Sequence, residues 1–144
     1  MKLKNFSYLL TLFSVFCVPT IVASFYLSSY INLQALVPFI ILVTIIGSIW
    51  DVWATKHGSR DKVWLWQFNN AQTIGLRFLG LPIEEYLFYV ASSVYVIFMW
   101  EGFMLMTQGA PEDVYFVIAL LSAWTLFSIM LPYVVGWKHD KFVG

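Results

Sequence analysis

Three carboxyl residues, Asp51, Glu84 and Glu85, are the side chains of this sequence best placed for acid–base chemistry. Each lies at one end of a long apolar stretch, where an ionisable group is costly and therefore a candidate for function. A carboxyl group removed from water favours its neutral form and can donate a proton, whereas a carboxylate beside it can accept one. We therefore predict Glu84, Glu85 and Asp51 as catalytic residues.

Helix-start chemistry offers a simpler explanation for two of these acids. Pro82 followed by Glu84 and Glu85 is typical of a first helical turn, in which acidic side chains interact favourably with the helix dipole. A helix terminus favours the ionised carboxylate by only about 0.3–1 kcal/mol, which is less than the effect of burial in an apolar site. The role of the two glutamates thus depends on whether they face a dry pocket or water.

The elements that must position these acids are apolar helices. The 144 residues are 60% hydrophobic and 11% charged, and the mean hydropathy is +0.78, whereas soluble domains are about 25% charged. A helix needs about 20 apolar residues to cross a membrane, and its backbone polar groups are satisfied internally. We predict an all-α integral membrane protein, a single domain with four transmembrane helices over residues 6–27, 33–53, 82–106 and 114–137.

Composition also excludes several classes of function. Lys and Arg total eight, as do Asp and Glu, so there is no basic excess for nucleic-acid binding. We expect no metal site, because His57 and His139 lie far apart and Cys17 is the single cysteine, and no cofactor, because no glycine-rich nucleotide-binding motif is present. The first apolar run is longer than that of a signal peptide, and we expect it to be retained.

The basic residues predict the orientation in the membrane. All eight Lys and Arg precede the first predicted helix, follow the fourth, or lie between the second and third. Because basic residues favour the cytoplasmic side, we expect a multi-pass protein of the cell membrane with both termini and the loop over residues 54–81 in the cytoplasm. The acids Glu101, Glu112 and Asp113 then lie at the external side, with structural or solvated roles.

The long loop does not have the composition of a linker. Residues 51–85 carry half of the charged residues and an unusual number of aromatic ones. Tryptophan at headgroup depth is a sufficient explanation for any one of them. In an extended segment, however, Trp64, Trp66 and Phe68 would face the same way and could form one wall of an apolar pocket. In the following helix, Glu85 and Tyr89 share a polar stripe beside an apolar stripe that contains Phe88.

The order of residues in this region resembles the small membrane lycopene cyclase domain, the non-flavin type of carotenoid-making bacteria, archaea and fungi. The resemblance covers about residues 33–106. It is carried by Trp50-Asp51-x-Trp53-Ala54-Thr55-Lys56-x-Gly58, Trp66-x-Phe68-Asn69, Thr73-x-Gly75 and Gly80-Leu81-Pro82-Ile83-Glu84-Glu85-x-Leu87-Phe88. Residues 59–63 make one gap longer than the family usually has.

The resemblance implies an isomerase that closes the acyclic ends of lycopene into β- or ε-rings without redox chemistry. Family members commonly work as two similar units, so we expect a second copy or a related subunit as partner, with the polyene isoprenoid substrate arriving from the lipid bilayer. The family's acidic residues correspond to Glu84, Glu85 and Asp51. Aromatic faces stabilise carbocations, and we predict that the substrate-binding residues are Trp53, Trp64, Trp66, Phe68, Phe88 and Tyr89.

Two other functions compete with this one. An intramembrane protease of the Glu-Glu type would need an arginine one turn after the glutamates and histidines within the helices, but Tyr89 stands at that position and neither histidine lies within a predicted span. A non-catalytic membrane partner or scaffold subunit stays open, because one unit alone can be incomplete.

Overall fold

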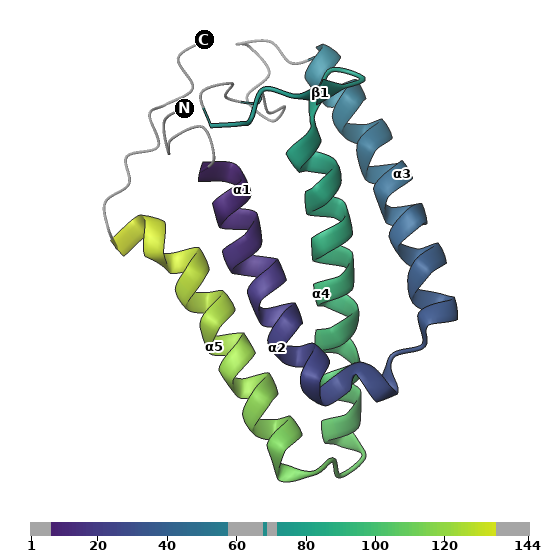
Figure 1. Ribbon diagram of the computed structural model, residues 1–144, viewed down its shortest axis with the longest axis vertical. Helices are drawn as coiled ribbons and strands as arrows, with labels where there is room; N and C mark the ends of the chain where they lie inside the picture. Colours follow the sequence, from purple (N-terminus) through teal and green to yellow (C-terminus); the bar gives the residue numbers. More distant parts are fainter. Residues whose placement is uncertain (1–6, 58–67, 69–71, 135–144) are drawn as a thin grey trace.

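The computed structural model describes residues 7–57, 68 and 72–134. In this part of the chain, four helical segments are long and apolar enough to cross a membrane, as the sequence predicts: Ser7–Tyr30, Leu33–His57, Ile83–Thr107 and Glu112–Met130. The protein is mostly helical, and the spans are arranged side by side (Figure 1).

The first span is interrupted by a wider turn. It consists of α1 (Ser7–Leu12), the π-helical turn η2 (Phe13–Cys17), α2 (Val18–Leu27) and the 3₁₀ turn η3 (Ser28–Tyr30). In η2, the backbone N–H of Val18 donates to the carbonyl of Phe13. Pro19 explains the wider turn, because a proline ring collides with the carbonyl four residues earlier and a π turn relieves that collision.

The remaining spans are continuous helices. They are α3 (Leu33–His57), α4 (Ile83–Thr107) and α5 (Glu112–Val134). Helix α3 extends to His57, beyond the expected end at Trp53, so residues 54–57 belong to the helix and not to the loop. Helix α5 begins two residues before the expected start, at Glu112, and the expected end of that helix at residue 137 lies outside the described residues.

Helix α4 lies at the centre of the arrangement. Figure 1 shows α1 and α2 between α5 and α4, with α3 on the other side of α4. The hydrophobic core joins α2, α4 and α5 and is formed by Ala23, Leu27, Phe98, Met99, Val114, Val117, Ile118 and Leu121. Gly102 lets α5 approach α4 closely, because a Cβ atom there would overlap the side chain of Ile118. The outer face of α3 stays exposed, as expected for a lipid-facing surface.

A short antiparallel hairpin lies at the end where α1 and α4 begin and α3 ends (Figure 1). Its strands, β1 (Arg77–Phe78) and β2 (Leu81–Pro82), pair Phe78 with Leu81. The two turn residues, Leu79 and Gly80, have φ angles of 50° and 89°, as a tight hairpin turn requires. The preceding segment is fixed to the helices, because Tyr8 N–H donates to the carbonyl of Gln72 and Ile83 N–H donates to that of Leu76.

Candidate active site

Asp51 is completely buried on the face of α3 that packs against α4. Its Oδ2 atom accepts a hydrogen bond from the Tyr89 hydroxyl of α4, with 2.5 Å between the oxygens. Its Oδ1 atom is also buried and receives no N–H or O–H bond from protein groups within the described residues. The carboxyl group of Glu85 lies within hydrogen-bonding reach of Asp51. Within the described residues, Asp51 therefore accepts a hydrogen bond from Tyr89 and has the Glu85 carboxyl group beside it.

Gly47 explains how Tyr89 reaches Asp51. It lies one turn before Asp51 on α3, and the ring of Tyr89 occupies the space in which any side chain at position 47 would lie. Glycine costs roughly 1 kcal/mol in a helix relative to alanine. Here it lets the tyrosine ring lie directly on the α3 backbone, with its hydroxyl at the next turn.

Glu85 belongs to the same cluster and is held from the first span. The hydroxyl of Tyr8 in α1 donates to its Oε2 atom at 2.7 Å. Glu85 retains 7% of its surface exposed, whereas Asp51 and Glu84 have none. Of the three predicted carboxyl residues, Glu85 is therefore the one that a bound molecule can reach directly.

Glu84 faces a different environment although it is adjacent in sequence. Its Oε1 atom accepts a hydrogen bond from the backbone N–H of Ile74 at 2.5 Å, and its side chain is fully buried. Successive helical residues point about 100° apart, so Glu84 turns toward the segment before the hairpin while Glu85 turns toward α1 and α3. The structure thus brings Asp51 and Glu85 together and uses Glu84 to hold the loop.

The predicted aromatic residues divide into two groups. Phe88 lies near the acids: its ring makes edge-to-face contacts with Tyr89 and with Phe16, with centroids 5.5 and 5.6 Å apart. Trp53 lies on the outer surface of α3, 40% exposed, and its ring stacks with His57 at 5.2 Å. Phe68 is half-buried.

Two further predicted residues, Trp64 and Trp66, lie outside the described residues. The proposed aromatic wall formed by the loop therefore stays a prediction.

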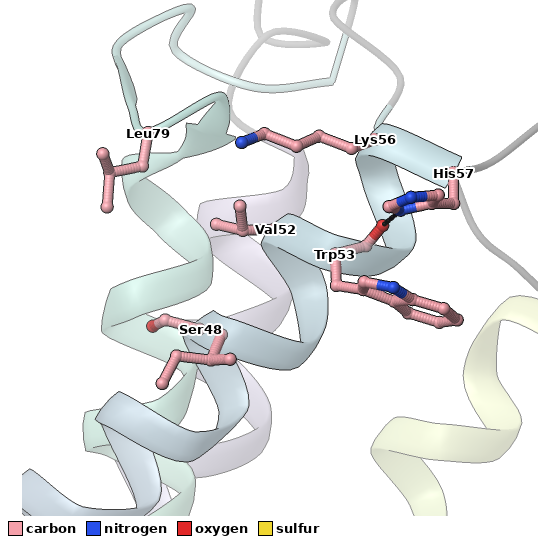
Figure 2. A pocket seen from close by; sticks show the side chains of 7 residues that line it. Ser48, Val52, Trp53, Lys56, His57 and Leu79 are labelled. Atoms are coloured by element: carbon pink, nitrogen blue, oxygen red, sulfur yellow. Dashed lines mark hydrogen bonds between the residues drawn. The ribbon is translucent and has the colours of Figure 1, made fainter.

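A pocket of about 410 Å³ lies on the outer side of α3 under the hairpin turn (Figure 2). Lys56 reaches across its upper side toward Leu79, whereas Trp53 and His57 point the other way. It is lined by Ser48, Ile49, Val52, Trp53, Lys56, His57 and Leu79. Among the predicted site residues that the structure describes, Trp53 is the one that lines this pocket. The carboxyl residues lie elsewhere on α3 and α4.

Sequence reasoning missed two parts of the cluster. Tyr8 lies 77 residues from Glu85 in sequence and has no local signal that distinguishes it from other interfacial tyrosines. Gly47 could have been noticed as a glycine within an apolar helix, four residues before Asp51, where close packing of another helix is a common reason for glycine. The hydroxyl of Tyr89 donates to Asp51, and the substrate-binding role of Tyr89 stays a prediction.

The fold and the site define a class of protein: a helical protein with four apolar spans and a buried carboxyl pair near one end of the bundle. The model of the lycopene cyclase family matches residues 3–103. The chain therefore belongs to the lycopene cyclase family, which connects it with carotenoid biosynthesis. Comparisons with curated proteins and with solved structures found no match. The matched region contains Tyr8, Asp51, Glu85 and Tyr89 and ends before α5.

Proposed function

We propose that this chain is one unit of a lycopene cyclase that closes the acyclic ends of lycopene by protonation, ring closure and proton loss. The observation that carries the proposal is the buried pair of Asp51 and Glu85 in a chain of this family. Two carboxyl groups within hydrogen-bonding reach of each other share one proton, because a hydrogen bond between them needs a donor. The pair thus combines an acid with a base.

The cyclisation needs only an acid that donates a proton and a base that removes one. Glu85 donates its proton to a terminal carbon–carbon double bond, which leaves a tertiary carbocation. The electrons of a neighbouring double bond form the ring bond, and the cation moves to the ring. A carboxylate then removes a proton from an adjacent carbon, which forms the new double bond and restores the acid. Atoms and electrons balance without an oxidant or a cofactor.

Exposure favours Glu85 over Glu84 as the proton donor. Glu85 has accessible surface and lies beside a second carboxyl group, whereas Glu84 is fully buried and engaged by a backbone N–H. Asp51 is then the base or the partner that holds the proton. The ring of Phe88 contacts Tyr89, which is bonded to Asp51, and the ring of Phe16 contacts Phe88. These rings are the candidate aromatic faces for a carbocation. Trp53 is the corresponding candidate on the outer surface of α3.

The membrane setting supports a substrate that arrives from the bilayer. The pair lies at the end of the bundle where α1 and α4 begin and α3 ends. The distribution of basic residues supports the proposal that this end lies on the cytoplasmic side of the cell membrane. A second copy or a related subunit is the expected partner, because members of this family commonly work as two units.

Expression in lycopene-accumulating cells tests the proposal. The chain should convert lycopene into cyclic carotenes, alone or when co-expressed with a related unit, and Glu85→Gln should abolish this conversion. Chromatography of the extracted pigments gives the readout. If the Asp51→Asn/Glu85→Gln double variant still forms cyclic products at the wild-type level, the carboxylic-acid mechanism is refuted. If the chain is active only together with a second unit, it is half of the enzyme.

A further inference from the structure

Each carboxyl group of the pair has one oxygen engaged by a tyrosine hydroxyl. Tyr8 donates to Oε2 of Glu85, and Tyr89 donates to Oδ2 of Asp51. These two tyrosines come from different spans, α1 and α4. Oε1 of Glu85 and Oδ1 of Asp51 receive no hydrogen bond from these tyrosines, and Oδ1 is buried without a donor among the described protein groups.

The tyrosines therefore restrict where the shared proton can be. An oxygen that accepts a hydroxyl hydrogen bond is a poorer place for an acid proton than the free oxygen of the same carboxyl group. Both hydroxyl bonds are compatible with a carboxylate or with a neutral acid as the acceptor. The exposed surface of Glu85, which Asp51 lacks, favours Glu85 as the member of the pair that holds the transferable proton.

We propose that Tyr8 is a positioning residue of the active site: its hydroxyl keeps Oε2 of Glu85 as an acceptor, so that the acid proton stays on Oε1, between Glu85 and Asp51. The catalytic part of this inference rests on the proposed function. The first span thereby supplies a component of the site and not only a membrane anchor.

Infrared spectroscopy of the purified full chain in lipid tests this directly and needs no substrate. At slightly alkaline pH, solvent-exposed carboxyl groups are ionised, and a protonated carboxyl group shows its own C=O stretching band. We expect such a band in the wild type and a clearly weaker band in the Asp51→Asn/Glu85→Gln double variant, which retains the fully buried Glu84. In Tyr8→Phe the band should move to higher frequency, because the C=O oxygen of Glu85 loses its donor.

The matched control is Tyr95→Phe. Tyr95 is also on α4, and its hydroxyl is within 2.7 Å of the Thr125 hydroxyl, so this variant loses a similar bond that does not involve the carboxyl pair. The band should not move in Tyr95→Phe. A band that is absent in the wild type, that keeps its full intensity in the double variant, or that does not move in Tyr8→Phe overturns the proposal.

Kinetics provide the second readout. Tyr8→Phe should lower kcat about tenfold with KM unchanged, because one hydrogen bond to the acid is lost while the substrate contacts stay the same. If the enzyme is active and Tyr8→Phe leaves kcat unchanged, the position that Tyr8 gives to Glu85 does not affect catalysis. If the infrared band shifts as expected but no preparation cyclises lycopene, the positioning holds and only the proposed function fails.

Discussion

The ring of Tyr89 in α4 lies directly on Gly47 in α3. This contact has a chemical consequence, since it brings the Tyr89 hydroxyl to the carboxyl group of Asp51 one turn further along α3. A helix position with no side chain thus determines the surroundings of an acid that it does not touch.

Gly47→Ala should disrupt this arrangement. The added methyl group would overlap the ring of Tyr89, so the ring must move and its hydroxyl leaves Asp51. We expect a loss of cyclisation comparable to that of Tyr89→Phe, measured as the ratio of cyclic carotene to lycopene in cells. Gly102→Ala is the control, because it crowds Ile118 in the core between α4 and α5: it should lower the melting temperature with less effect on product formation per folded protein. Equal activity of Gly47→Ala and wild type would contradict the role of this contact.

Replacement of the adjacent glutamates should separate catalysis from structure. Glu85→Gln removes the acid, and a positioned general acid contributes about 10²–10⁴-fold to rate, so activity should fall by at least about 100-fold. Glu84→Gln should stay active, because its amide oxygen can still accept from the Ile74 N–H.

A third variant, Glu84→Leu, tests the structural role of Glu84. It leaves the Ile74 N–H unpaired, which costs about 1–3 kcal/mol in the free energy of unfolding. Thermal unfolding in detergent and pigment analysis measure the two effects. If Glu84→Gln and Glu85→Gln lose the same amount of activity, the assignment of catalysis to Glu85 and of a structural role to Glu84 is wrong.

Leu79 has a backbone conformation that suits asparagine or glycine better. Its φ of 50° places it in the left-handed region, at a cost of roughly 1–2 kcal/mol for a residue with a β-carbon. Leu79→Asn should therefore raise the melting temperature, because asparagine tolerates that conformation. The same change removes an apolar side chain from the pocket on α3, which Trp53 also lines. Because Trp53 is predicted to bind substrate, the change should weaken the quenching of tryptophan fluorescence by an added polyene.

Leu76→Asn is the control for this change. Leu76 is equally exposed on the same loop, but it has no left-handed backbone and does not line the pocket. Leu76→Asn should therefore affect the melting temperature and the fluorescence quenching less than Leu79→Asn does. A melting temperature that does not rise in Leu79→Asn would exclude backbone strain at this turn.

Pro19→Ala should change the direction in which the Tyr8 side chain points. Without the proline, the turn Phe13–Cys17 can return to a regular α-helix, which rotates the residues before it by about 100° relative to α2. Tyr8 would then leave Glu85, and the carboxylic-acid infrared band should shift as in Tyr8→Phe. Pro38→Ala in α3, where no π turn occurs, should leave the band in place. An unshifted band in Pro19→Ala would show that the π turn does not set the position of Tyr8.

The sequence by itself determined the environment of the chain and the location of its acids. Long stretches without charge predict apolar spans, because a lipid-facing helix excludes charged side chains over its whole length and leaves an uninterrupted pattern. The same scarcity of charge singled out Asp51, Glu84 and Glu85, and the ordered motifs around them indicated the family that residues 3–103 then matched.

Only the tertiary structure decided which acids work together. Glu84 and Glu85 are neighbours in sequence, yet one accepts from the Ile74 backbone and the other lies beside Asp51. Their separation follows from the helical rotation of 100° combined with the packing of α1 and α3 on different sides of α4. Tyr8 joins the site from 77 residues away, and no local periodicity encodes such a contact, because it depends on how whole spans pack and on where the π turn directs the first one.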